Sequence, residues 1–133
     1  MKVSKKEDFA ILLMTVLAEN YSIKYIPLSF VSRKTGLSPL FLKHIALELK
    51  NKGLIESREG TLGGYRLNQT PDSISAAQII NAVSEGSIVK VSCTKKTCVV
   101  GRDNCICFVF WGNFNRKMYS YLDNVKLSEI AGL

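Results

Sequence analysis

The four cysteines of the chain are the residues whose spacing most clearly indicates chemistry. Cys93, Cys98, Cys105 and Cys107 all lie within one 15-residue stretch. Without a secretory context, clustered cysteines bind metal or sense redox state more often than they form structural disulfides. The spacing C-x4-C-x6-C-x-C lacks the paired C-x2-C pattern typical of zinc sites. The stretch therefore indicates a metal or redox site, and spacing alone leaves its occupant open.

An enzyme site is not expected elsewhere in the sequence. The chain has a single histidine, His44, and shows no paired-carboxylate pattern, no nucleophile constellation and no phosphate-binding glycine loop. His44 lies next to Lys43, and we interpret it as a surface residue rather than a metal ligand. The candidate chemistry is therefore concentrated in the cysteine stretch.

The charge balance favours a polyanionic partner. The chain carries 18 Lys and Arg against 11 Asp and Glu, and five of the seven net positive charges lie at or before Arg66. Neutralising phosphates releases condensed counterions, so this excess suits nucleic acid, although charge by itself is a weak criterion.

Size and hydropathy favour one cytoplasmic globular domain with an accessory element. The 133 residues are 47% apolar, which is enough to build a core. The longest apolar run near the start, over 9–18, is too short and too interrupted to cross a membrane, and no signal-peptide cleavage site accompanies it. We therefore expect no membrane association.

The elements that must position these residues begin with helices. Ser4 and Glu7 have the spacing of a capping box, and apolar residues at helical spacing predict a helix to about residue 19. The segment 20–26 is expected to be a loop or turn. A short helix is predicted over 27–35, ended by Gly36.

A third helix is predicted directly afterwards, with Ser38 as N-cap, Pro39 at its first position and Gly53 closing it. Its predicted buried stripe is Leu42, Ile45, Ala46 and Leu49. Two short helices joined by a tight glycine turn are typical of a helix-turn-helix, and at this point an ordinary helical hairpin explains the pattern about equally well.

A predicted β-hairpin decides between these alternatives. Strand-like segments over 54–58 and 65–67 flank a glycine-containing turn over 59–64. Three helices followed by a hairpin is the order of a winged helix. Arg58 and Arg66 make the wing basic, at positions from which side chains could reach a phosphate backbone or the minor groove.

The C-terminal half predicts a helix over 75–83 with a Ser75–Gln78 capping box, a loop over 86–104, and a long helix over about 105–124. Apolar residues of the long helix alternate in steps of four and three, an a/d seam that suits burial against the chain's own core or a second copy. The seam comprises Cys107, Trp111, Phe114, Met118, Tyr121 and Val125. We favour a second copy, because two-fold symmetry matches a palindromic site.

The predicted fold is mainly α with a small β-hairpin: a winged helix-turn-helix plus a long C-terminal dimerisation helix. The winged helix-turn-helix DNA-binding domain is expected over residues 1–86 and a cysteine-rich sensing loop over 87–104. The dimerisation helix and C-terminal segment are expected over 105–133.

Several short motifs, distributed over essentially the whole chain, follow one another in a specific order and spacing. They are Met1-Lys2-Val3-Ser4-Lys5, Gly36-Leu37-Ser38, Lys52-Gly53-Leu54-Ile55, Gly63-Gly64-Tyr65-Arg66-Leu67, Ile79-Ile80-Asn81-Ala82-Val83, the cysteine loop, Trp111 and Val125-Lys126-Leu127-Ser128-Glu129-Ile130. Together they resemble the IscR/NsrR/RirA/CymR-type winged-helix transcription regulators, the Rrf2 family.

The resemblance implies a homodimeric DNA-binding transcription regulator, in most cases a repressor, whose recognition helix enters the major groove of a palindromic operator in double-stranded DNA. The implied DNA contacts are Lys6, Ser38, Leu40, Lys43, Arg58 and Thr61. Residues 38–43 lie off the predicted buried stripe, at a helix start whose free amides favour phosphate. Lys43 could pair with a guanine edge or contact phosphate.

One departure from the family pattern lies in the wing. The usual Arg-Gly-Pro-Gly-Gly-Gly is here Glu59-Gly60-Thr61-Leu62-Gly63-Gly64. An acidic residue replaces the expected arginine, so wing contacts or sequence preference are expected to differ, with Arg58 as the candidate for compensation.

The resemblance also implies a 2Fe-2S or 4Fe-4S iron–sulfur cluster that senses redox state, iron or nitric oxide. Cys93, Cys98 and Cys105 match the family's three ligands, with the middle one shifted by a residue. Thiolates are the preferred ligands of such clusters.

The fourth ligand stays open. IscR-type chains use a histidine where this chain has Phe108, so either Cys107 or Asp8 of the partner subunit, as in NsrR-type sensors, would complete the site. Cys107 is turned about 200° from Cys105 on a helix and lies on the apolar seam, where it could instead be a small buried hydrophobe. Asp8 could instead serve the helix dipole, and we favour it as the ligand.

Two other functions compete with this one. CymR-type members of the family lack a cluster, and in such a protein the cysteines would be thiol switches or incidental, with control by thiol chemistry or a partner protein. From another class, the chain could be a zinc-holding interaction module without a DNA role.

Overall fold

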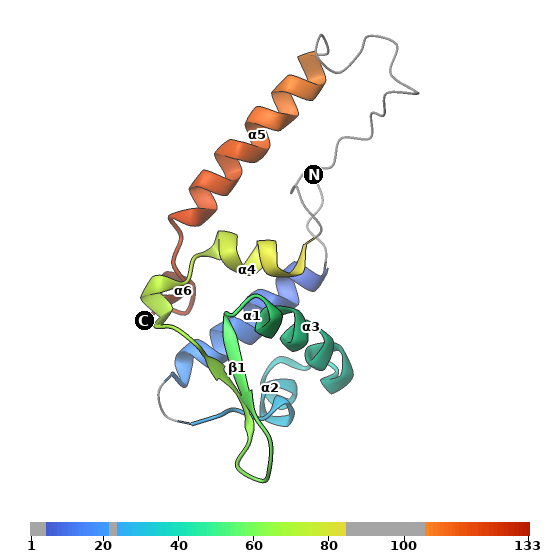
Figure 1. The fold of residues 1–133 in the computed structure, drawn as a ribbon, viewed down its shortest axis with the longest axis vertical. Helices are drawn as coiled ribbons and strands as arrows, with labels where there is room; N and C mark the ends of the chain where they lie inside the picture. Colours follow the sequence, from blue (N-terminus) through green and yellow to red (C-terminus); the bar gives the residue numbers. More distant parts are fainter. Residues whose placement is uncertain (1–4, 22–23, 85–105) are drawn as a thin grey trace.

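The computed structural model describes residues 5–21, 24–84 and 106–133, and confirms a mainly helical fold with one two-stranded antiparallel hairpin (Figure 1). Its elements are α1 (Lys5–Glu19), α2 (Leu28–Thr35), α3 (Pro39–Asn51), β1 (Ile55–Arg58), β2 (Gly64–Leu67), the 3-10 turn η1 (Pro71–Ser73), α4 (Ala76–Val83), α5 (Ile106–Asp123) and α6 (Leu127–Ile130). The predicted Ser4 capping box and the 86–104 loop lie outside the described residues. None of the described helices is long and apolar enough to span a membrane.

The turn between α2 and α3 forms as the sequence predicts. Gly36 ends α2 with a φ of 80°, and its N–H donates to Ser32 O at 2.8 Å. Pro39 then begins α3 after Ser38, although the Ser38 hydroxyl makes no capping hydrogen bond. A left-handed residue costs little when it is glycine, so the two helices join within a tight turn.

A single hydrophobic core joins the N-terminal helices to the C-terminal segment. The predicted stripe of α3, comprising Leu42, Ile45, Ala46 and Leu49, is fully buried. It packs with Leu13, Met14 and Leu17 of α1, Ile79 of α4 and Leu127 of α6. Residues beyond α5 therefore contribute to the body formed by the first 84 residues, while the predicted domain boundaries near residues 86 and 104 stay predictions.

The hairpin is anchored by a third stretch of backbone. Strand β1 pairs with β2 in the register Ile55↔Leu67 to Arg58↔Gly64. The Ile26 N–H donates to Tyr65 O and the Tyr65 N–H donates to Ile26 O, both at 2.8 Å. The segment before α2, expected to be a loop or turn, thus adds a strand-like residue beside β2.

Glycine 64 permits this pairing. Gly64 has a φ of 148°, and a Cβ built there would lie 2.3 Å from Ile26 O. Both the backbone conformation and the contact exclude a side chain. This is the physical reason for a glycine immediately before Tyr65.

The C-terminal segment after α5 is also held by backbone hydrogen bonds to a distant part of the chain, at the start of α4. The Ser75–Gln78 capping box is confirmed, with the Gln78 N–H donating to Ser75 Oγ at 3.2 Å and the Ser75 N–H to Gln78 Oε1 at 2.9 Å. Ser75 also bridges to Lys126: the Ala76 N–H donates to Val125 O, and the Leu127 N–H to Ile74 O, both at 2.8 Å. These bonds hold the segment between α5 and α6 against the start of α4.

Helix α5 projects away from this body, and its first turn lies at the remote end (Figure 1). The chain's own core does not cover it: Ile106 is 81% exposed, Phe110 57% and Tyr121 64%. Trp111 and Phe114 are half-buried and contact each other edge to face, with ring centroids 5.4 Å apart. Met118 and Val125 of the seam are likewise partly buried, while Cys107 and Tyr121 are exposed, so the choice between the chain's own core and a second copy stays a prediction.

Gly64→Ala tests the anchoring of the hairpin. We expect it to lower the free energy of unfolding by about 2–4 kcal/mol, because the Cβ collides with Ile26 and the backbone is strained. Urea denaturation followed by circular dichroism measures this change. Gly53→Ala is the matched control, since Gly53 also has a positive φ, 77°, but nothing lies within 4 Å of its Cβ position. It should cost only about 1 kcal/mol, and equal losses in the two variants would contradict the role of the Ile26 contact.

Candidate nucleic-acid interface

The start of α3 presents three of the predicted DNA contacts to solvent. Ser38, Leu40 and Lys43 are all exposed, and Leu40 reaches 79%. They share this side of the helix because the stripe from Leu42 to Leu49 faces the core. The unpaired amides at the helix start lie beside them, and the helix dipole makes this end attractive to phosphate.

The wing presents the next two predicted contacts. Arg58 ends β1 and Thr61 lies in the turn, and both side chains are exposed. The Arg58 guanidinium is 5.9 Å from the centre of the Tyr25 ring, a weak cation–π contact that leaves the charge accessible. The geometry thus groups Ser38, Leu40 and Lys43 on one element and Arg58 and Thr61 on another.

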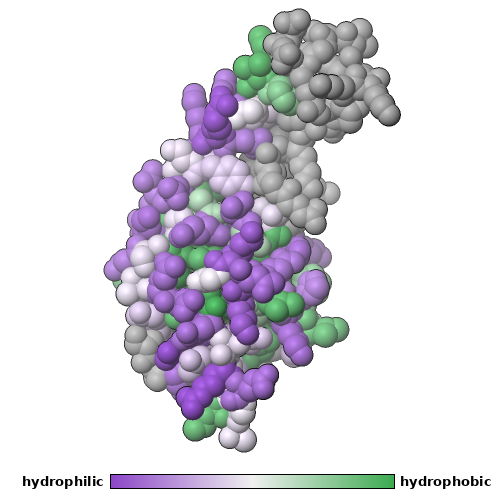
Figure 2. All heavy atoms as spheres, viewed as in Figure 1, coloured by the Kyte–Doolittle hydropathy of each residue, from purple (hydrophilic) through white to green (hydrophobic). Residues whose placement is uncertain are grey.

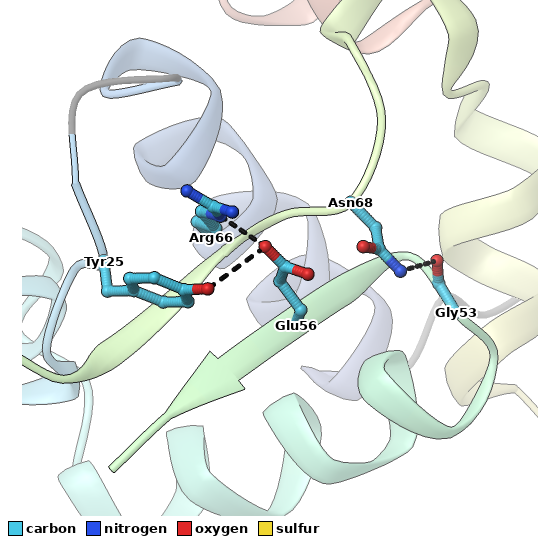
Figure 3. A network of polar contacts seen from close by, with 5 residues as sticks. All are labelled: Tyr25, Gly53, Glu56, Arg66 and Asn68. Atoms are coloured by element: carbon cyan, nitrogen blue, oxygen red, sulfur yellow. Dashed lines mark hydrogen bonds and ion pairs between the residues drawn. The ribbon is translucent and has the colours of Figure 1, made fainter. Parts of the chain in front are cut away.

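The second wing arginine is held by the protein itself (Figure 3). Arg66 Nε donates a hydrogen bond to Glu56 Oε1 in an ion pair, and its guanidinium lies 4.5 Å from the centre of the Tyr25 ring. The Tyr25 hydroxyl donates to the same Glu56 oxygen at 3.3 Å. The hydrogen bond from Arg66 lowers the pKa of Glu56, and the same bond raises the pKa of Arg66.

This network changes the expected role of Arg66. Since the pKa of Glu56 is lowered, its carboxylate is ionised at neutral pH, and the pair is lost only when the pH falls through that lowered pKa. The sequence treats Arg58 and Arg66 as equivalent wing cations, and the structure distinguishes them. Cross-strand neighbours on one face of a hairpin are the signal that reveals Glu56 opposite Arg66.

Lys6 is also paired within the chain. Its Nζ lies 2.7 Å from Glu48 Oε1, in the second half of α3, with both side chains partly buried. One turn along α1, the Phe9 ring contacts Phe41 of α3 edge to face, with centroids 5.4 Å apart. The structure therefore places Lys6 against the later half of α3 rather than beside Ser38, and its predicted DNA contact stays a prediction.

The predicted metal ligands fall mainly outside the described residues, where Cys93, Cys98 and Cys105 lie. Asp8, in the first turn of α1, and Cys107, in the first turn of α5, are described and exposed. Because Cys107 is exposed in the single chain, its alternative role as a small buried hydrophobe would require a second copy along the seam and stays a prediction. Among the described residues, no three His, Cys, Asp or Glu side chains gather into a metal site. His44 is exposed, in agreement with its interpretation as a surface residue.

Leu62 is the exposed residue that the sequence interpretation missed. It lies in the hairpin turn and is 86% exposed. An apolar residue in a predicted turn between two strands is a signal that could have identified it, because turn tips are seldom buried.

Comparison with known proteins gives a consistent picture. The model of the Rrf2 family, described as iron-dependent transcriptional regulators, matches residues 3–132. The transcriptional regulator IscR of Aliivibrio salmonicida is 31% identical over 130 residues, covering 98% of this chain and 77% of that protein. The structure of CymR, the global cysteine regulator of B. subtilis, superposes with a TM-score of 0.78 at 27% identity, covering 99% of this chain and 97% of CymR. T. potens IscR has the same fold, with a TM-score of 0.76 at 23% identity over 98% of this chain and 85% of that one.

Glu56→Gln tests whether the chain restrains Arg66. The change should free the guanidinium for phosphate, so the slope of log K against log salt for duplex DNA should steepen by up to about 0.9. Fluorescence anisotropy at several salt concentrations measures the slope. Glu59→Gln is the control, because it removes an exposed carboxylate from the same hairpin and has no ion pair among the described residues. Equal steepening in both variants would mean that general charge, and not release of Arg66, is responsible.

Proposed function

This chain belongs to the Rrf2 family of transcriptional regulators, and we propose that it is a homodimeric repressor that binds a palindromic operator and senses its signal through an iron–sulfur cluster. DNA-binding regulation follows from the family. The observation that carries the finer proposal is the exposed set at the start of α3, beside a basic wing residue, on a body whose long helix has an uncovered apolar face.

The start of α3 supports major-groove docking. Its exposed side chains stand on a helix whose opposite side is locked into the core, so their position is fixed before DNA binds. Lys43 is suited to a guanine edge or a phosphate, and Ser38 to a phosphate beside the free amides. Arg58 and Thr61 of the wing would then lie against the adjacent backbone.

Helix α5 supports dimerisation. In the described part of the chain, Cys107 and Tyr121 of the seam are exposed, and the other four seam residues are only partly buried. Apolar side chains left partly open along one helix face favour burial against a partner. A second copy would cover it with the same residues, as an isologous interface requires. Two recognition helices related by a two-fold axis would match a palindromic operator.

The donor set suits an iron–sulfur cluster. Cys93, Cys98 and Cys105 would supply three thiolates, and a cluster held there would provide a centre that responds to oxidation, nitrosylation or iron loss. Helix α5 begins far from the start of α1 (Figure 1), and in the proposed arrangement the carboxylate of Asp8 would come from the second copy. Exposure of Asp8 agrees with this arrangement, and Cys107 is the competing fourth ligand.

A cluster-free regulator is the second candidate. The similarity to the solved CymR structure favours it, as does the exposed Cys107 thiol, which would be open to reversible oxidation. In this alternative the DNA-binding surface is unchanged, and only the sensing chemistry differs.

Lys43→Met tests the DNA-binding surface. We expect weaker binding to a duplex selected by the wild-type protein from a random library, with the salt slope reduced by about 1. Lys117→Met, which removes an exposed charge from α5, should leave both quantities nearly unchanged. Lys6→Met tests the predicted contact of Lys6: a reduced slope would support it, and an unchanged slope would mean that the ammonium stays paired with Glu48. The stoichiometry should be two chains per duplex, and a slope unaffected by Lys43→Met would contradict the proposed interface.

Cys98→Ala tests the cluster. After anaerobic purification, the wild-type protein should show visible absorbance with iron and sulfide, and Cys98→Ala should lose all three while keeping its helical circular dichroism. Asp8→Asn should alter the spectrum if Asp8 is the fourth ligand, and Cys107→Ala should do so in its place if Cys107 is. Asp72→Asn, an exposed carboxylate on η1, is the control. Wild-type protein without iron or sulfide after reconstitution would overturn the cluster and favour the thiol-controlled alternative.

A further inference from the structure

The tip of the wing carries an apolar side chain where a DNA-contacting turn would ordinarily rely on charge. The turn between β1 and β2 contains Glu59, Gly60, Thr61, Leu62 and Gly63, and none of these residues is a cation. Leu62 is 86% exposed, more than any other large hydrophobic residue in the described part of the chain. Glu59, at the start of the same turn, would be repelled by phosphate, so no charge of the turn itself favours DNA.

The turn is also stiff, which gives Leu62 a defined position. The Gly63 N–H donates to Gly60 O at 3.0 Å, and a Cβ at Gly63 would lie 2.1 Å from Arg58 O. The hairpin is also fixed close to the turn, by the bonds between Ile26 and Tyr65. These contacts fix the backbone on both sides of Leu62, so the turn holds its Cα at the tip of the hairpin.

The hairpin turn projects from the end of the body opposite α5 (Figure 1). Figure 2 shows hydrophobic atoms at this lower end, where Figure 1 places the turn, next to strongly hydrophilic side chains. Arg58 stands at the end of β1, immediately before the turn, and its charge is accessible. An apolar residue at the tip, with a cation just before the turn, is complementary to a DNA groove, whose edges carry phosphates and whose floor is less polar.

We propose that Leu62 enters the minor groove of the operator and packs against deoxyribose and base edges, while Arg58 holds the flanking phosphate. The proposal rests on the DNA-binding function proposed above. The minor groove is about 6 Å wide and admits single apolar side chains, which other DNA-binding proteins insert between or against base pairs. A single leucine is too small to form a stable interface with another protein, which needs roughly 800 Å² on each side.

The salt dependence of DNA binding distinguishes an apolar contact from a phosphate contact, because only the phosphate contact contributes to the slope. Leu62→Ala should weaken binding to the selected duplex about fivefold to tenfold, as expected for partial burial of the lost side-chain carbons, and should leave the salt slope unchanged. Arg58→Met should reduce the slope by about 1. Leu62→Met should keep nearly wild-type affinity, because it preserves the apolar volume.

Leu133→Ala is the matched control. Leu133 is 67% exposed and lies beyond α6, away from the wing, so its loss should not change DNA affinity. Unfolding of all variants is followed in parallel, and equal stability of Leu62→Ala and the wild type excludes a folding effect.

Inosine distinguishes the minor groove from the backbone. Replacing guanine by inosine at the base pairs under the wing removes the minor-groove amino group and leaves the major-groove pattern intact. The wild-type protein should bind the inosine duplex more tightly, because the amino group obstructs the leucine, and Leu62→Ala should not distinguish the two duplexes.

The outcomes separate the two proposals. If the wild-type protein selects no duplex, the proposed DNA-binding function fails. If it binds DNA and Leu62→Ala binds equally well, or if the salt slope changes with Leu62→Ala, the minor-groove contact fails and the DNA-binding function stands.

Discussion

The backbone pairing between Ile26 and Tyr65 is the constraint on which the candidate interface depends. It ties the hairpin to the segment that leads directly into α2, and therefore to the helix pair that presents the start of α3. The pairing requires the close approach that only a glycine at position 64 permits. Because of this connection, the hairpin is held in place relative to α2 and the start of α3, so in the proposed complex a DNA groove would meet both elements together.

A second set of contacts joins α1 to α3. The ion pair of Lys6 with Glu48 and the edge-to-face contact of Phe9 with Phe41 hold the recognition helix near both of its ends. Asp8, the favoured fourth ligand, lies between Lys6 and Phe9 on the same turn of α1. A partly exposed ion pair contributes about 1 kcal/mol, so burial of the α3 stripe contributes more to holding α3 against α1 than this polar contact does.

Much of the fold follows from local sequence. The glycine at 36, the proline at 39 and the Ser75–Gln78 capping box act within a few residues, and each is found where the pattern predicts it. The buried stripe of α3 is also predictable from local sequence, since helical periodicity alone assigns Leu42 and Leu49 to the core. The same periodicity predicts that Ser38, Leu40 and Lys43 are exposed, because they lie outside the buried stripe.

What the sequence determined by itself was the order of the elements, the buried stripe and the family, because each depends on spacing along the chain. Only the tertiary structure decided how the charges are used. Arg66 faces Glu56 across the hairpin and Lys6 faces Glu48 across two helices, so these cations are engaged while Arg58 stays accessible. The exposure of Cys107 likewise depends on which distant segments pack against the start of α5. Such contacts join residues far apart in the chain, and short-range spacing carries no information about which distant side chains the folded backbone brings together.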